Sequence, residues 1–204
     1  MARPSAADKR RMILDAAVRV FARQGFHTAR VSDIADEAGV AYGLVYHYFG
    51  SKDEVLDTLF LDRWNILLDA IREVDGRDAP PRDKLLAITS FIVDSYRYDP
   101  DVMKVIIVEV TRAANSFGQK HLDKIREAYD LIADIVDDGQ RAGAFRDNIT
   151  PRFAALAFYG AIEQVLTGWI FDLLPQGEAG FEEAKAFVVE TICSGLEAPA
   201  TTPI

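Results

Sequence analysis

The fold of this chain is decided by one stretch near its N-terminus. Residues 25–55 read GFHTARVSDIADEAGVAYGLVYHYFGSKDEV. Hydrophobic spacing predicts a short helix over 31–38 and a second over 42–48. Gly39 lies between them, and glycine adopts the positive φ that ends a helix and lets the chain turn sharply. The stretch therefore predicts a helix-turn-helix, a motif that presents its second helix to the major groove of DNA.

The second helix of this pair has two different sides. Val45 and Phe49 are spaced to anchor it inward, which leaves a polar and aromatic side facing outward. That outward side is expected to carry Tyr42, Gly43, Tyr46 and His47. A glycine inside a helix costs roughly 1 kcal/mol relative to alanine, a cost that makes sense where the backbone must approach another surface closely. Two alternatives stay open, because a tyrosine here can be a core aromatic and a histidine can be a solvated side chain.

The rest of the chain also has the pattern of helices. Apolar residues recur every three to four positions between glycine stops and capped starts, and no alternating strand pattern or internal repeat interrupts them. Ser51 and Glu54 have capping-box spacing, while Asp99-Pro100 and Thr150-Pro151 combine an N-cap with a first-turn proline. We predict an all-α fold of about nine helices. They are expected at about 8–24, 31–38, 42–48, 51–71, 82–96, 100–110, 119–142, 151–173 and 181–197.

Composition and charge narrow the class of protein. The 204 residues are 50% hydrophobic, which is enough to build a core and excludes a disordered chain. The net charge is −9, yet residues 1–52 carry a net +3 and the remainder a net −12. A basic head on an acidic body favours a polyanionic partner at one end, with chance clustering as the alternative.

Several kinds of site and location are not expected. The single cysteine, Cys193, excludes an internal disulfide framework and an all-cysteine zinc site, and it fits a reducing compartment. His27 and His121 have no partners at ligand spacing, so we expect no metal and no cofactor. The N-terminus lacks the apolar run of a secretory signal, and we expect a cytoplasmic protein. The apolar stretch 153–174 contains Glu163 and Asp172, which favours a buried or subunit-contacting helix over a membrane span.

The stretch 25–55 closely resembles the N-terminal domain of TetR-family transcriptional regulators. The resemblance rests on a set of short motifs: Gly25-Phe26, Ile34-Ala35, Ala38-Gly39-Val40, Gly43, Tyr46, Phe49 and Ser51-Lys52. It implies a helix-turn-helix DNA-binding domain over 1–50 and a helical effector-binding and dimerisation domain over 51–204. It also implies a homodimer, formed through the eighth and ninth helices, on a double-stranded DNA operator.

The resemblance assigns roles to eight residues of the head. Arg30 and Ser32 match positions that contact phosphates. Tyr42, Gly43 and Leu44 match positions that read base edges. Tyr46, His47 and Lys52 match positions that grip the DNA backbone. Ala41 departs from the family pattern because a serine usually caps this helix, and Leu44 departs because it can contact a thymine methyl group but cannot form a hydrogen bond.

The C-terminal part gives weaker signals. Glu109 and Glu163 interrupt apolar helix faces, and a carboxylate there must be paired, protonated or in a wet cavity. With aromatic neighbours they form a candidate effector pocket: Phe91, Tyr96, Glu109, Phe158, Tyr159, Glu163 and Trp169. The alternatives for each are a buried ion pair or a place in the dimer interface. DKLLAITSFI (83–92) and FYGAIEQVLTGWIF (158–171) resemble the subgroup that controls fatty-acid degradation, which implies an apolar effector such as a long-chain acyl-CoA.

These observations together predict a ligand-released repressor that is not an enzyme. Two other classes stay open: a helical enzyme or ligand carrier, and a dimeric interaction protein that does not use its DNA-binding head. No nucleophile–base pair, phosphate loop or metal spacing supports the enzyme. The interaction protein would show no effect of small molecules on DNA affinity.

Overall fold

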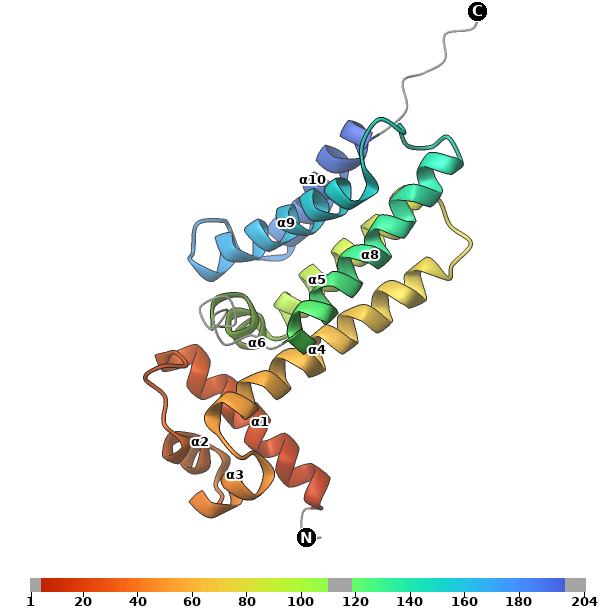
Figure 1. Cartoon of the computed structure of the whole chain (residues 1–204). Helices are drawn as coiled ribbons and strands as arrows, with labels where there is room; N and C mark the ends of the chain where they lie inside the picture. Colours follow the sequence, from red (N-terminus) through yellow and green to blue (C-terminus); the bar gives the residue numbers. More distant parts are fainter. Residues whose placement is uncertain (1–4, 110–118, 197–204) are drawn as a thin grey trace, which may run out of the picture. The chain divides into compact units, whose positions relative to one another are not determined.

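The computed structural model describes residues 5–109 and 119–196 of the chain. Within these residues it contains nine α-helices, one π-helical segment and no strand, which confirms the predicted all-α fold (Figure 1). The elements are α1 (Ala6–Gln24), α2 (Val31–Ala38), α3 (Tyr42–Tyr48), α4 (Lys52–Asp75), α5 (Pro81–Tyr98), α6 (Pro100–Lys104), η1 (Val105–Glu109), α8 (Gln119–Arg141), α9 (Pro151–Ile170) and α10 (Glu178–Leu196).

The chain divides into two compact units. The first comprises Met1–Arg63 with Asp99–Gly118, and the second comprises Trp64–Tyr98 with Gln119–Ile204. Helix α4 supplies residues to both, because the division falls within it. The domain boundary predicted between 50 and 51 lies just before α4, which begins at Lys52, and it stays a prediction.

The first unit is built around α1. The side chain of Ser5 caps this helix by accepting from the Asp8 N–H at 3.1 Å, and the Asp8 carboxylate accepts from the Ser5 N–H at 2.9 Å. Helix α2 packs on α1, and so do α6 and η1. The core of the unit is apolar throughout. Its buried side chains include Ile13, Leu14, Val18, Phe21, Phe26, Ile34, Val45, Phe49, Val55 and Phe60.

Two predicted details of the helix ends differ in the structure. The Ser51 hydroxyl accepts from the Glu54 N–H at 3.0 Å as expected, but the Glu54 carboxylate accepts from Gly50, one residue earlier than a capping box requires. The predicted sixth helix is α-helical only over Pro100–Lys104 and continues as the π-helix Val105–Glu109. Its run of β-branched side chains has a weaker preference for the α-helix.

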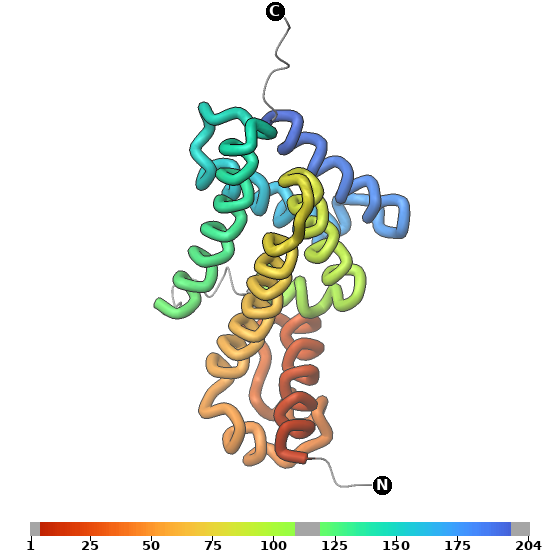
Figure 2. Tube along the Cα trace, turned by 90° about the vertical axis from the view of Figure 1, so that its right-hand side faces the viewer, coloured from red at the N-terminus to blue at the C-terminus, as the bar shows by residue number. Residues whose placement is uncertain are grey.

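The second unit is a bundle of α5, α8, α9 and α10 with the C-terminal part of α4. Helix α9 packs on α8 and α10, and α10 packs on α5 (Figure 2). Its core includes Leu68, Ile71, Leu85, Ile88, Ile132, Val136, Phe158, Ile162, Trp169 and Val188. One buried cation, Lys185 on α10, donates to Asp94 of α5 at 2.8 Å and to Glu182 at 2.7 Å. Burial lowers the pKa of Lys185, but the two carboxylates more than offset this, so its net pKa is raised.

Candidate nucleic-acid interface

The turn between α2 and α3 has the geometry that the sequence predicts. Gly39 has φ 65° and ψ 34°, and its N–H donates to carbonyls of the last turn of α2. Val45 and Phe49 are buried, as expected for the inward anchors of α3. The guanidinium of Arg10 on α1 lies over the Phe49 ring, 5.3 Å from its centroid. These contacts fix α3 against the rest of the unit and leave its opposite side open.

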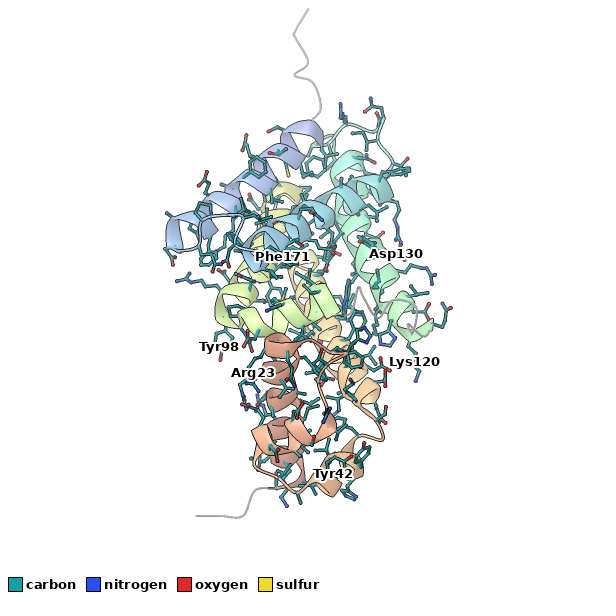
Figure 3. The ribbon with its side chains drawn as sticks, turned by 90° about the vertical axis from the view of Figure 1, so that its left-hand side faces the viewer. Arg23, Tyr42, Tyr98, Lys120, Asp130 and Phe171 are labelled. Atoms are coloured by element: carbon teal, nitrogen blue, oxygen red, sulfur yellow. The ribbon has the colours of Figure 1, made fainter. Side chains whose placement is uncertain are left out.

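The open side of α3 carries a pair of tyrosines. Tyr42 is 54% exposed and Tyr46 is 44% exposed, and Figure 3 shows Tyr42 at the outer edge of the first unit. Their rings meet edge to face with centroids 5.2 Å apart, and their hydroxyl oxygens are 3.2 Å apart. The hydrogen bond between the two hydroxyl groups raises the pKa of Tyr46.

Gly43 lies beside Tyr42 on the same helix. A methyl group at this position would meet no atom of another element within 4 Å, so packing inside the protein does not require a glycine here. His47 is also exposed, whereas Leu44 is half-buried. The structure therefore brings four of the predicted residues (Tyr42, Gly43, Tyr46 and His47) to one open helix surface.

Arg30 and Ser32 lie at the start of α2. Arg30 is the N-cap residue, and its side chain is exposed. The cap itself comes from Asp33, whose carboxylate accepts from the Arg30 N–H at 2.9 Å and from the side-chain amide of Gln24 at 2.8 Å. The hydrogen bonds from Arg30 and Gln24 lower the pKa of Asp33. Ser32 is half-buried. The sequence pattern did not single out Gln24 and Asp33, although Asp33 stands three residues after the N-cap.

The predicted phosphate contact Lys52 has partners inside the protein. Its ammonium lies 2.6 Å from the Phe26 carbonyl, 2.8 Å from that of Ala29 and 3.4 Å from that of His27. It also lies over the Phe26 ring, 4.4 Å from its centroid. No signal in the sequence indicated which groups this lysine contacts.

The cations of the first unit differ in how far they are neutralised. Arg19 and Arg23 of α1 both pair with Glu37 of α2, at 2.7 and 3.3 Å. The hydrogen bond from Arg19, and then that from Arg23, lowers the pKa of Glu37 against the effect of burial. Among the described residues, Arg30 and Arg11 form no ion pair within 4 Å. Their charges are therefore not neutralised by any carboxylate that the structure describes in the first unit.

Most of the predicted effector-pocket aromatics lie in the core of the second unit. Tyr96 and Trp169 are buried and stacked, with centroids 5.3 Å apart, and Phe181 packs against both rings. The Trp169 indole donates to the Pro175 carbonyl at 3.0 Å. Phe158 is fully buried, while Phe91 is half-buried. These contacts give each ring a packing role whether or not a ligand binds beside it.

Glu163 of α9 has a different environment. It is half-buried, and within the described part of the chain its carboxylate has no hydrogen bond or ion pair. Burial raises its pKa. Tyr159, one turn earlier, contacts the rings of Tyr129 and Trp64, with centroids 5.6 and 5.9 Å away. Burial, followed by the charge of Glu163, raises the pKa of Tyr159. The side chain of Glu109, also predicted for this site, lies outside the described residues.

Two further findings concern metal and membrane. The described ranges contain no group of three or more histidine, cysteine, aspartate or glutamate side chains that could hold a metal ion. Only α9 among the described helices is long and apolar enough to cross a membrane by length and composition. It packs on α8 and α10, as a core helix does.

Comparison with known proteins identifies the family. The family model described as "Bacterial regulatory proteins, tetR family" matches residues 13–59, and that for the "Tetracyclin repressor-like, C-terminal domain" matches residues 81–192. The fatty acid metabolism regulator protein of Bacillus subtilis (strain 168) is 28% identical over 160 residues, covering 78% of this chain and 82% of the relative.

Two solved structures extend this likeness over nearly the whole chain. The fatty acid degradation regulator FadR from Bacillus halodurans superposes with a TM-score of 0.83 and 26% identity, covering 96% of this chain and 98% of the other. FadR from Bacillus subtilis, solved in complex with stearoyl-CoA, gives a TM-score of 0.81 and 26% identity, covering 92% and 99%. The chain therefore belongs to the TetR family of DNA-binding transcriptional regulators.

Proposed function

We propose that this regulator is a homodimeric repressor whose α3 helices enter successive major grooves of a pseudo-palindromic operator. The observation that carries this proposal is the open surface of α3, where Tyr42, Gly43, Tyr46 and His47 stand outward while Val45 and Phe49 are buried. Residues 42–44 are assigned to the base edges. Tyr46 and His47, together with Arg30 and Ser32, are assigned to the phosphates. The proposal gives the protein no catalytic role and a cytoplasmic location.

Helices α9 and α10, the eighth and ninth of the sequence analysis, are assigned to the dimer interface. Large apolar side chains on them are exposed in the single chain: Phe153 is 71% exposed and Phe187 is 60% exposed. Phe171, directly after α9, is also exposed. A second copy that covers these side chains would remove apolar area from water, which is the main driving force of dimerisation.

The effector is proposed to be a long apolar molecule such as a long-chain acyl-CoA. The support is the similarity to a FadR structure that holds stearoyl-CoA. The second unit, with Glu163, Tyr159, Phe91 and the buried aromatics, is assigned to bind it. The effector releases the operator only if it binds the released conformation more tightly than the DNA-bound one.

The proposal is tested by selecting binding sites from random duplex DNA with the purified protein. Enrichment of an inverted repeat, bound with an affinity that falls steeply as salt rises, is the expected result. Stearoyl-CoA, with free coenzyme A as the control, should then weaken binding to that repeat. If the folded, dimeric protein enriches no repeat, the DNA-reading function is refuted. If the repeat binds equally with and without stearoyl-CoA, only the effector assignment is lost.

A further inference from the structure

Lys52, the first residue of α4, uses its whole hydrogen-bonding capacity inside the first unit. A lysine ammonium carries three protons. Three carbonyl oxygens surround it, those of Phe26 at 2.6 Å, Ala29 at 2.8 Å and His27 at 3.4 Å. Hydrogen bonds from a charged donor are about twice as strong as neutral ones. A phosphate could therefore be contacted only by giving up one of these bonds.

The ring of Phe26 holds the ammonium from another side. It lies 4.4 Å from the lysine nitrogen, within the range of a cation–π interaction. Phe26 is itself buried and packs edge to face on Phe21 of α1, with centroids 5.3 Å apart. The lysine is thus tied to the core of the unit as well as to the loop.

The peptide bond between Ala29 and Arg30 is held at both of its polar ends. Its carbonyl accepts from Lys52, and its N–H donates to Asp33 in the first turn of α2. This peptide is the entrance to the α2–α3 pair, since α2 begins at Val31. Lys52 stands just beyond the exit of the pair, because α3 ends at Tyr48. One side chain therefore joins the two ends of the helix-turn-helix.

We propose that Lys52 is a positioning residue that closes the helix-turn-helix by binding the carbonyls of the loop 26–29. It sets the angle at which α2 leaves this loop, and so the place of Arg30 and of α3. Its effect on DNA binding is indirect and adds no phosphate contact. The inference rests on the DNA-reading function proposed above only for its effect on operator affinity.

The test compares Lys52→Met with a control variant, Arg30→Ala. The control removes a proposed phosphate contact next to the Ala29–Arg30 peptide bond but leaves the Lys52 side chain in place. Hydrogen exchange of the backbone amides 29–34 is followed in the free protein. Lys52→Met should speed exchange there by about tenfold, the size expected for losing hydrogen bonds to a charged group. Arg30→Ala should leave it unchanged.

The second readout is the salt dependence of operator affinity. The slope of log K against log salt is negative, and each lost phosphate contact makes it shallower by roughly 0.9. Losing one contact in each subunit therefore makes the slope of a dimer shallower by about 1.8. Arg30→Ala should show this change. Lys52→Met should weaken binding about tenfold with the slope unchanged. The proposal would be overturned if Lys52→Met made the slope as shallow as Arg30→Ala does. It would also be overturned if Lys52→Met left hydrogen exchange at 29–34 unaltered.

Two precautions keep the outcomes distinct. If Lys52→Met does not fold, Phe26→Leu removes the ring beneath the ammonium while keeping an apolar side chain, and the same exchange measurement applies. If the wild-type protein binds no operator, the proposed DNA function has failed, but exchange in the free protein still decides whether Lys52 holds the loop.

Discussion

Replacing Gly43 by alanine separates stability from DNA binding. Apart from its chain neighbours and the backbone of its own helix, a methyl group at this position would meet no atom of the protein within 4 Å, and the backbone φ is not in the left-handed region. Alanine is favoured over glycine inside a helix by up to about 1 kcal/mol. The variant should therefore be more stable than the wild type, with Tm raised by about 2–4 °C for a chain of this size.

The same methyl group should impair DNA binding. It would stand beside Tyr42 on the open surface of α3, where the proposal brings the backbone close to the base edges. We expect operator affinity to fall at least tenfold, which corresponds to about 1.4 kcal/mol. Thermal unfolding and operator titration at one salt concentration measure the two effects on the same preparation.

Gly195→Ala provides the matched control. Gly195 lies in α10 of the second unit, is exposed, and offers the same open space to a methyl group. This variant should gain a little stability and bind the operator as the wild type does. The reasoning is refuted if Gly43→Ala is stabilised and yet binds with wild-type affinity, since the backbone at 43 would then not approach DNA.

Three further predictions concern the core, the dimer and the half-buried carboxylate. Phe49→Ala should lower the free energy of unfolding by about 3–5 kcal/mol, because this ring is fully buried. Denaturant titration measures the loss, and a change below about 1 kcal/mol would contradict the packing described for Phe49. Phe187→Glu should convert the dimer to monomers at micromolar concentration in sedimentation experiments while leaving the helical circular-dichroism signal intact; a dimer as tight as the wild type removes α10 from the interface. Glu163 has a raised pKa in the folded state, so its contribution to stability is present below the ordinary carboxyl range and is lost as pH rises through the raised value. Glu163→Gln should therefore unfold at a higher temperature than the wild type at pH 7 but not at pH 4, and equal Tm values at pH 7 count against the raised pKa.

The reading helix could be predicted closely because its signals are local. The bounds of α2 and α3 were predicted to the residue, since Gly39 fixes the turn and the anchors Val45 and Phe49 fix the inward side. The capping partner of Glu54 was predicted one residue off, because hydrogen-bond register depends on backbone geometry that spacing does not specify.

Long-range contacts were beyond the sequence. A lysine at the start of α4 indicates a cation near a helix end. The amino-acid sequence does not indicate whether Lys52 faces a phosphate or the carbonyls of a loop some 25 residues away. The aromatic residues of the second unit pose the same difficulty. A ring such as Trp169 has the same apolar character whether it lines a ligand site or fills a core, so its stacking on Tyr96 could be learned only from the structure.

The contact between Tyr42 and Tyr46 has a consequence for the entropy of binding. Each ring restricts the rotamers of the other, and the two hydroxyl groups are already joined before any DNA is present. Immobilising a free side chain on association costs about 0.5–1.5 kcal/mol, and this pre-organised pair avoids part of that cost. The benefit is the same for every DNA sequence that α3 meets. This pre-organisation therefore strengthens binding in general, and discrimination between operators comes from the contacts that residues 42–44 make with the base edges.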